Sequence, residues 1–446
     1  METKMKEMAY LIGVSVPVFQ FLLCFVATIP VSFFHRFVPG GSTGKHLYAA
    51  FTGAVLSYLS FGLSSNMHFL VPMIISYGFM VFYRKRCGLI TFLLAMGYLI
   101  GCHVYYMSGD AWKEGDIDAT GALMVITLKV ISCTINYNDG LLKEEDLRQT
   151  QKKNRLLKLP SFIEYVGYCL CCGSHFAGPV YEMKDYLDWT EMKGIWMKSD
   201  RPSPSPLGGT VKAILQAAFC MGAYIYLAPQ YPLSRFTDPI YNEWGFMERL
   251  IYQYMCSFTA RWKYYFIWSI SEASMILSGL GFSGWTNRSP QKARWERAKN
   301  VDILGVEFAK NVYDRLVLKG RKPGFFQLLA TQTISAVWHG LYPGYMIFFV
   351  QSALMISGSK AIYRWQQSVP SDKRGLKKML MHSNFAYTVL VLNYSAVGFM
   401  VLSLDETITA YGSVYFIGTI VPVVFIILGN IVAKPKPAAP RVRKQQ

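Results

Sequence analysis

Charge is scarce in this sequence. Only 16% of its 446 residues are Asp, Glu, Lys or Arg, whereas 52% are hydrophobic and 15% are aromatic. A typical soluble domain carries about 25% charged residues, and a disordered chain has too few apolar residues to bury a core. The composition therefore excludes an intrinsically disordered chain and argues against a soluble one.

Acidic residues are the scarcer of the two charged classes. Asp and Glu number 27 against 45 Lys and Arg, which gives a formal net charge of +18. The sequence has no Walker A phosphate loop, no H-E-x-x-H zinc motif and no G-x-G-x-x-G after a predicted strand. No signature of a nucleic-acid-binding fold accompanies the basic charge either, so we predict no nucleic-acid partner. The excess fits the positive loops of a membrane protein and attraction to anionic lipids.

The apolar residues are concentrated in runs long enough to cross a bilayer, for which a helix needs about 20 mostly apolar residues. Seven runs contain no Asp, Glu, Lys or Arg: residues 9–34, 46–83, 87–109, 213–234, 323–359, 379–404 and 407–433. Residues 46–83 and 323–359 are each long enough for two crossings, and residues 119–138 and 250–287 are apolar but interrupted by charge. We predict an all-α, polytopic membrane protein of about 11 transmembrane helices.

Basic residues flank these runs on alternate sides, which predicts the orientation of the chain. Arg84, Lys85, Arg86 and the six Lys and Arg of residues 138–160 lie on the side opposite to the acidic loop 110–118. The positive-inside rule places the basic loops in the cytosol. We therefore expect residues 1–433 to form a single polytopic membrane domain and residues 434–446 to form a basic cytosolic tail.

Nine cysteines, an odd number, do not predict a disulfide framework. Most lie in apolar runs, where cysteine behaves as a small hydrophobic residue. Cys169, Cys171, Cys172 and His175 resemble a metal-binding group, but a second ligand pair at zinc spacing is missing. We expect buried thiols rather than a metal site, with palmitoylation as the second alternative.

His339 is the leading candidate for a functional residue, because an ionisable side chain at membrane depth is costly. It lies in the uncharged run 323–359, and Gly340, Pro343 and Gly344 interrupt helical regularity directly after it. Irregular backbone at this depth is tolerated where it is buried in protein or lines a cavity. A neutral imidazole facing a cavity can accept a proton from a substrate hydroxyl, whereas the alternative is a histidine that only bonds a carbonyl between helices.

Two further polar segments stand out. Arg261 and Glu272 are about three helical turns apart, which places them on one face as a polar stripe, with Lys263 nearby. The alternative is that Arg261 and Lys263 mark a cytosolic helix end and Glu272 bonds a neighbouring helix. The second segment, residues 173–183, is interrupted by Gly and Pro and is suited to a re-entrant or interfacial loop, in which His175 either handles protons or belongs to a structural turn.

Three blocks occur in a fixed order along the chain: Gly178-Pro179-Val180-Tyr181, then Ser271-Glu272-Ala273 with Gly279-Leu280-Gly281-Phe282, then Trp338-His339-Gly340 with Gly344-Tyr345. Together they resemble the membrane-bound O-acyltransferase family, in particular its plant-type lysophospholipid acyltransferase branch. The resemblance covers nearly the whole chain. It implies a polytopic helical fold that encloses an intramembrane reaction chamber.

The resemblance also implies an activity. This is transfer of a fatty acyl group from acyl-CoA to the free hydroxyl of a lysophospholipid such as lysophosphatidylcholine. Acyl-CoA is a co-substrate, and no further cofactor is expected. The implied role is phospholipid remodelling at the endoplasmic reticulum membrane. His339 would be the catalytic base, in a site that excludes water. The expected substrate-binding residues are Trp338, Glu272, Arg261, Lys263 and Tyr181. Arg443-Lys444 resembles a dibasic retrieval signal for that membrane, or is simply part of the positive tail.

One motif of the family is missing. The family pairs its histidine with an upstream asparagine in a Trp-Asn motif, but residues 299–326 contain no tryptophan. Neither Asn300 nor Asn311 matches the motif, and the chain continues after Lys310 as though a segment were absent. We therefore expect acyl transfer to be severely impaired.

Three hypotheses follow for this chain. It acylates lysophospholipids with His339 alone or with a substitute polar partner, or it is an inactive shortened isoform that keeps membrane targeting and associates with an intact copy as a homo-oligomer. The third hypothesis, from another class, is a multi-span transporter in which His339 relays protons. Inverted repeats are not visible in the sequence, which argues against transport.

Overall fold

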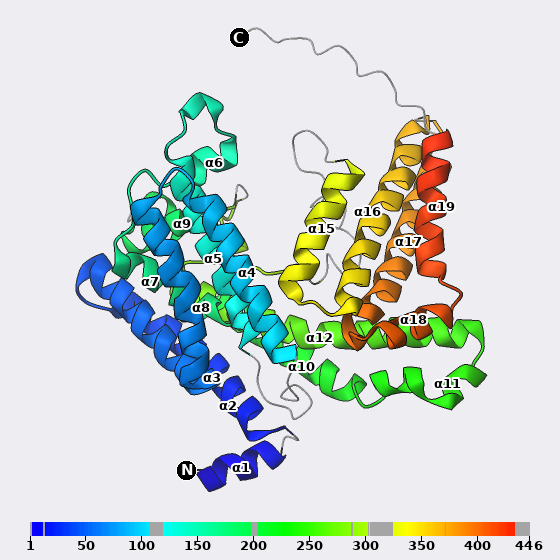
Figure 1. Cartoon of the computed structure of the whole chain (residues 1–446), viewed down its shortest axis with the longest axis horizontal. Coiled ribbons are helices and arrows are strands. Elements are labelled where there is room, and N and C mark those ends of the chain that lie inside the picture. The colour runs from blue at the N-terminus through cyan, green and yellow to red at the C-terminus, as the bar shows by residue number, and fades with distance from the viewer. Residues whose placement is uncertain are drawn as a thin grey trace. The chain divides into compact units, whose positions relative to one another are not determined.

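The structure, a computed structural model, describes residues 2–11, 14–107, 119–197, 204–286, 289–301, 303, 324–370 and 372–432. Helices dominate this part of the chain, which confirms the predicted all-α class (Figure 1). The acidic loop 110–118, Asn311 and the basic tail 434–446 lie outside the described residues.

The chain packs into two compact units, each made from two separate stretches. The first unit comprises Met1–Ile225 and Trp262–Val301, and the second comprises Tyr226–Arg261 and Asp302–Gln446. The predicted single domain over residues 1–433 stays a prediction. The helix α12 (Phe246–Ser278) contributes its first half to the second unit and its second half to the first.

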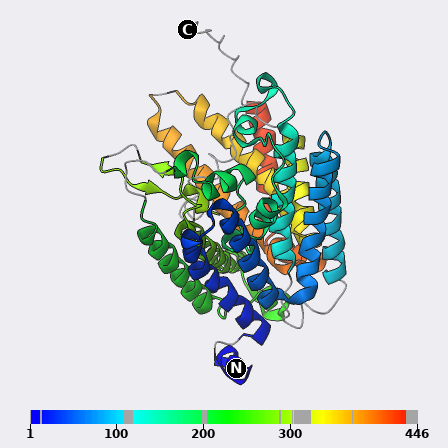
Figure 2. The same cartoon turned by 90° about the vertical axis from the view of Figure 1, so that its left-hand side faces the viewer.

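The first unit contains most of the helices. They are α1 (Glu2–Leu11), α2 (Val16–Phe34), α3 (Gly41–Phe82), α4 (Cys87–Met107), α5 (Thr120–Asp139), α6 (Gln149–Asn154), α7 (Phe162–Leu170), α8 (Cys172–His175), α9 (Met183–Thr190) and all but the end of α10 (Leu207–Leu227), with the 3-10 helices η1 (His35–Phe37), η2 (Glu144–Asp146), η3 (Gly194–Trp196) and η5 (Glu296–Ala298). A two-residue antiparallel pair, β1 (Gly284–Trp285) and β2 (Ala293–Arg294), follows α12. Helices α3, α4 and α5 pack on one another, and Figure 2 shows α3 and α4 side by side.

The second unit is built around the end of the chain. Its helices are η4 (Leu233–Thr237), α11 (Pro239–Glu243), α15 (Phe325–His339), α16 (Pro343–Ser368), α17 (Arg374–Val401), α18 (Leu404–Gly412) and α19 (Ile417–Val432). Helix α16 packs against α15, α17 and α19, and the four helices stand next to one another in Figure 1.

Seven helices are long and apolar enough to cross a membrane: Val16–Phe37, Gly41–Phe82, Cys87–Tyr106, Thr120–Asp139, Leu207–Leu227, Pro343–Ser368 and Arg374–Val401. Helices α18 and α19 add an eighth if they form one span, which is then bent by 72°. The polytopic membrane class is as predicted, but the number of about 11 is not confirmed within the described residues. Helix α15 has only 15 residues, and α12 carries charged side chains along its length.

Helix α3, with 42 residues, enters this number once, although its helical backbone is interrupted. A straight helix of this length would span about 63 Å, twice the hydrocarbon core of a bilayer at about 30 Å. Gly62, with φ 77° and ψ −179°, breaks its helical backbone near the middle. Glycine is suited to this position because it has no Cβ to clash at positive φ. Helix α3 therefore consists of two segments, each of about membrane length.

The backbone break predicted after His339 is present. Helix α15 ends at His339, Gly340 has a φ of 141°, and α16 begins at Pro343. Proline at the first position of a helix lacks only an N–H that has no partner within the helix. The sequence Gly340-Leu341-Tyr342-Pro343 thus ends one helix and starts the next.

The start of α16 is held against the end of α17 by a close backbone contact. The Gly344 N–H donates to the Leu402 carbonyl at 2.9 Å. A Cβ at Gly344 would lie 2.1 Å from the Gly398 carbonyl oxygen and 2.9 Å from the Leu402 Cα. No side chain fits there, so the turn after His339 is fixed to α17 through a glycine.

We expect Gly344→Ala to destabilise the protein by about 1–3 kcal/mol, because the added methyl group meets backbone that cannot move aside cheaply. Gly375→Ala on α17 is the matched control, since a Cβ there meets nothing within 4 Å. The thermal unfolding midpoint of purified protein in detergent is the measurement. Equal midpoints for the two variants would contradict the packing described here.

Candidate active site

His339 is the last residue of α15, and its ring is fixed by its own helix. The ring Nδ1 lies 2.9 Å from the Ser335 carbonyl oxygen, one turn earlier. A carbonyl oxygen can only accept, so this hydrogen bond requires the proton to be on Nδ1. The neutral ring then carries its lone pair on Nε2, and that is the nitrogen able to accept a proton.

Aromatic side chains from three helices surround the His339 ring. Its centroid lies 4.6 Å from that of Trp338, which is nearly perpendicular to it, 4.8 Å from Phe349 on α16 and 5.6 Å from Phe399 on α17. Tyr345 follows at 6.1 Å. The ring is half-buried. That His339 also faces a cavity stays a prediction.

Arg261 also belongs to the second unit. Its guanidinium donates to the Asn393 side-chain oxygen on α17 and lies 5.6 Å from the ring of Phe258, on its own helix. Ser257, one turn before Arg261, donates to the Asn393 backbone carbonyl at 2.7 Å. Arg261 is half-buried, and its hydrogen bond joins the middle of α12 to α17. The residue therefore does not lie at a helix end.

Three other predicted site residues lie in the first unit, so the structure does not place them relative to His339. Lys263 is exposed and Glu272 is half-buried on α12. Burial raises the pKa of the Glu272 carboxyl above its usual range, and the nearby Lys299 and Lys212 oppose this shift only in part. Tyr181 is buried, with 6% of its surface exposed.

Lys129 on α5 is a buried residue that the sequence analysis did not single out. It is fully buried, and its ammonium lies 4.8 Å from the centre of the Tyr181 ring. It donates to the carbonyls of Tyr168 at 3.0 Å and Cys169 at 3.3 Å, and to the Ser174 hydroxyl at 2.7 Å. Both carbonyls belong to the last turn of α7, where a helix has acceptors without internal partners and favours a cation.

Two more residues of α5 hold the segment that contains Tyr181. The Ser132 hydroxyl donates to the Glu182 carboxylate at 2.5 Å, and the Asn136 side chain donates to the same oxygen at 2.6 Å. Lys129, Ser132 and Asn136 lie at helical spacing on one face of α5. This polar stripe within an apolar run was a signal in the sequence that pointed to an anchor for residues 173–183.

The segment 173–183 is a buried structural element in the first unit, which favours the turn over proton handling for His175. His175 has no exposed surface, its Nε2 lies 3.2 Å from the Ser57 hydroxyl, and its ring is perpendicular to that of Phe69. Helix α8 lies outside the seven candidate spans, and burial, with a smaller contribution from Lys129, lowers the pKa of His175 to about 3.

The cysteines agree with the expectation of buried thiols. All nine are buried thiols outside any disulfide. Among the residues described, no group of three or more His, Cys, Asp or Glu side chains is arranged to hold a metal ion. Asn300 lies against Gly178 in the first unit, where a Cβ on the glycine would come within 2.8 Å of the Asn300 side-chain oxygen.

Comparison with known proteins shows which protein family the sequence matches. The sequence model of MBOAT, the membrane-bound O-acyltransferase family, matches residues 104–311 and 307–402. The chain is 67% identical to lysophospholipid acyltransferase 1 of Arabidopsis thaliana, over 99% of this chain and 100% of that protein. It is 65% identical to lysophospholipid acyltransferase 2 of the same plant, over 99% of both chains. A more distant relative is membrane-bound glycerophospholipid O-acyltransferase 1 of Mus musculus, 27% identical over 93% of this chain and 90% of that protein.

The family match is divided at one place. The two matched ranges overlap at residues 307–311, so the family model matches the chain in two parts rather than in one continuous alignment. This is the position, after Lys310, at which the sequence analysis infers a missing segment. The residues around the division lie outside the part of the chain that the structure describes.

We expect Lys129→Met to destabilise the protein by about 1–3 kcal/mol, because the carbonyls at the end of α7 would lose their donor without access to water. Lys85→Met, at an exposed lysine, is the control and should change stability by no more than about 0.5 kcal/mol. Thermal unfolding of both variants in the same detergent measures the difference. A Lys129→Met protein as stable as the control would refute the anchoring role of this lysine.

Proposed function

The chain belongs to the membrane-bound O-acyltransferase family, and we propose that it transfers a fatty acyl group from acyl-CoA to the free hydroxyl of a lysophospholipid. Two relatives at 67% and 65% identity carry the name lysophospholipid acyltransferase and align over their entire or nearly entire length. The single structural observation that supports this chemistry best is the hydrogen bond from the His339 Nδ1–H to the Ser335 carbonyl, which leaves the lone pair of the neutral ring on Nε2.

His339 supplies the step that an alcohol needs before it can attack a thioester. As the lysophospholipid oxygen forms a bond to the acyl carbonyl carbon, Nε2 takes the hydroxyl proton. The tetrahedral intermediate then collapses, the carbon–sulfur bond breaks, and the proton passes from Nε2 to the departing CoA sulfur. The products are a phospholipid and free CoA, and the ring returns to its starting tautomer. No covalent acyl-enzyme is needed.

The aromatic side chains around His339 have a second role in this proposal. Water competes with the lipid hydroxyl for the thioester, and a site that admits water would hydrolyse the donor. Trp338, Phe349 and Phe399 pack around the ring and limit the approach of water to Nε2. The lipid acceptor, with its apolar chain, approaches from the bilayer.

Acyl-CoA carries several phosphate charges and approaches from the cytosolic side, where the basic loops are expected. Lys263 and Arg261 are the proposed cations for these phosphates, and Lys263 is exposed on α12. Tyr181 and Glu272 remain proposed substrate-binding residues. We further propose the endoplasmic reticulum membrane as the location, from the dibasic Arg443-Lys444 near the carboxyl end. Membership of an acyltransferase family disfavours the transporter hypothesis.

The missing Trp-Asn motif bears on the rate rather than on the type of reaction. A base alone leaves the negative charge of the tetrahedral intermediate without a fixed donor, and the loss of one such donor in other enzymes costs about 10²–10³ in rate. We therefore propose that this chain is a much weaker catalyst than relatives that contain the segment.

We expect His339→Gln to lower the rate of acyl transfer by about 10²–10⁴, because the amide cannot accept the hydroxyl proton in the transition state. The matched control is His382→Gln, at an exposed histidine of α17. Microsomes from cells without background activity, supplied with labelled oleoyl-CoA and lysophosphatidylcholine, give the rates. The account fails if both variants transfer at the rate of the unaltered chain.

Insertion of the corresponding segment of the Arabidopsis relative between Lys310 and Asn311 should raise the rate by about 10²–10³, the value of one oxyanion donor. A scrambled insert of equal length controls for the added length. The same microsomal assay measures both proteins, and the inserted chain also provides a faster background for His339→Gln. An unchanged rate with the authentic segment would show that the chain does not lack this part of the machinery.

A further inference from the structure

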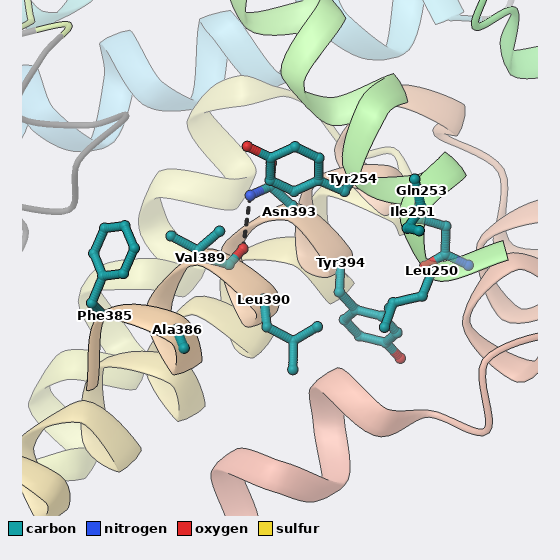
Figure 3. A pocket seen from close by; sticks show the side chains of 10 residues that line it. All are labelled: Leu250, Ile251, Gln253, Tyr254, Phe385, Ala386, Val389, Leu390, Asn393 and Tyr394. Carbon is teal, nitrogen blue, oxygen red and sulfur yellow. Dashed lines mark hydrogen bonds between the residues drawn. The ribbon is translucent and has the colours of Figure 1, made fainter. Parts of the chain in front are cut away.

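An apolar groove lies within the second unit, between the first half of α12 and the middle of α17 (Figure 3). Its volume is about 390 Å³. Its lining residues are Leu250, Ile251, Gln253 and Tyr254 from α12, and Phe385, Ala386, Val389, Leu390, Asn393 and Tyr394 from α17. The volume falls in the range of small-molecule sites, roughly 300–1,000 Å³.

The medium around the groove determines what can fill it. Helix α17 (Arg374–Val401) is one of the seven candidate spans, so we expect its middle to lie at the depth of the hydrocarbon core. Ala386 and Phe385 are exposed, whereas Val389 and Leu390 are half-buried. A flexible alkyl chain matches this surface in chemistry and in shape.

Asn393 forms one polar part of the groove wall, and its side chain bonds to the protein. Its amide donates to the Val389 carbonyl at 2.7 Å, the bond drawn in Figure 3, and its oxygen accepts from Arg261. Because these bonds are made inside the protein, the wall that Asn393 presents needs no polar partner from a ligand. Gln253 adds a second polar side chain, whose Nε2 donates to the Ala410 carbonyl at 2.6 Å and whose buried Oε1 has no hydrogen-bond partner among the described residues. The rest of the lining is mostly apolar, which suits the apolar part of a lipid.

This groove is separate from the contacts of His339. Phe399, the α17 residue that packs on the His339 ring, follows Leu390 by nine residues. At 3.6 residues per turn this is about two and a half turns, which places Phe399 and Leu390 on opposite sides of α17. A chain bound against Leu390 therefore lies on the other side of α17 from Phe399, and Phe385, which shares the face of Phe399, is 14 residues earlier, about 21 Å along the helix.

We propose that the α12–α17 groove is an accessory lipid site that binds one acyl chain of a bilayer glycerophospholipid. Its headgroup remains at the membrane surface, and the chain extends along α17 beside residues 385–394. The site retains a phospholipid on the protein independently of acyl transfer, because the occupant is not positioned to react at His339. Its test does not depend on whether the chain is an active enzyme.

Phosphatidylcholine with a diazirine in the middle of one chain tests the site in reconstituted vesicles. We expect photolabelled peptides from residues 250–254 and 385–394 after purification, well above the labelling of the lipid-exposed face of α10, where Leu215 and Phe219 are exposed. An unlabelled phosphatidylcholine excess should reduce the labelling. Labelling of these residues no higher than that of α10 would overturn the proposal without the use of any variant.

Ala386→Trp tests the groove directly, because an indole at this exposed, groove-lining position fills the space for the chain. If the indole excludes as few as two methylene groups of the acyl chain from the groove, phospholipid retention should fall about tenfold, because each buried methylene contributes about 0.8 kcal/mol. Val424→Trp, at an exposed position of α19 outside the groove, is the control and should retain the lipid. Native mass spectrometry counts the bound lipid.

Three results would contradict the proposal. The first is that Ala386→Trp retains as much phospholipid as Val424→Trp. The second is that oleoyl-CoA displaces the label where phosphatidylcholine does not, which would make the groove a donor-substrate site. The third is that Ala386→Trp converts a dimer to a monomer without loss of lipid, which would make the groove an interface between copies of this chain. A thermal unfolding midpoint equal to that of Val424→Trp shows that the Ala386→Trp protein is folded.

Discussion

The hydrogen bond between the Nδ1–H of His339 and the Ser335 carbonyl is the interaction on which the functional account depends. It fixes one tautomer, and it does so within a single helical turn, so the ring keeps its lone pair on Nε2. The backbone break at Gly340 and the close contact of Gly344 with α17 then hold the ring among aromatic side chains of α16 and α17. A base in this setting has a defined direction for its lone pair and little freedom to turn away from it.

The same constraint, that polar atoms in an apolar medium need partners, explains other parts of the structure. Lys129 pairs with the carbonyls at the end of α7, and Asn393 pairs with Arg261 and with its own helix. Gln351 on α16 bonds the Gly418 carbonyl at the start of α19. In each case one polar side chain joins two elements that hydrophobic packing alone would leave free to slide, since lipid chains are as apolar as the helix surfaces.

Much of this architecture could be predicted from the sequence, for a physical reason. The cost of unpaired backbone in a bilayer forces uncharged runs into helices, so the helical class, the break after His339 and the family blocks were all accessible. The number of spans was not, because charge along α12 cannot distinguish a span from a surface helix. The site was predicted only in part. His339 stood out as an ionisable residue in an apolar run, whereas the pairing of Arg261 with Asn393 joins residues 132 positions apart, and no local pattern indicates it.

Nitrogen-15 NMR of histidine-labelled protein tests the central claim most directly, with the His339 signals assigned by their loss in a variant that lacks this ring. The account predicts a neutral imidazole with a protonated Nδ1 and an unprotonated Nε2 at neutral pH. A ring protonated on Nε2, either as the other tautomer or as the imidazolium cation, would contradict it, because no lone pair would then be available for the substrate hydroxyl.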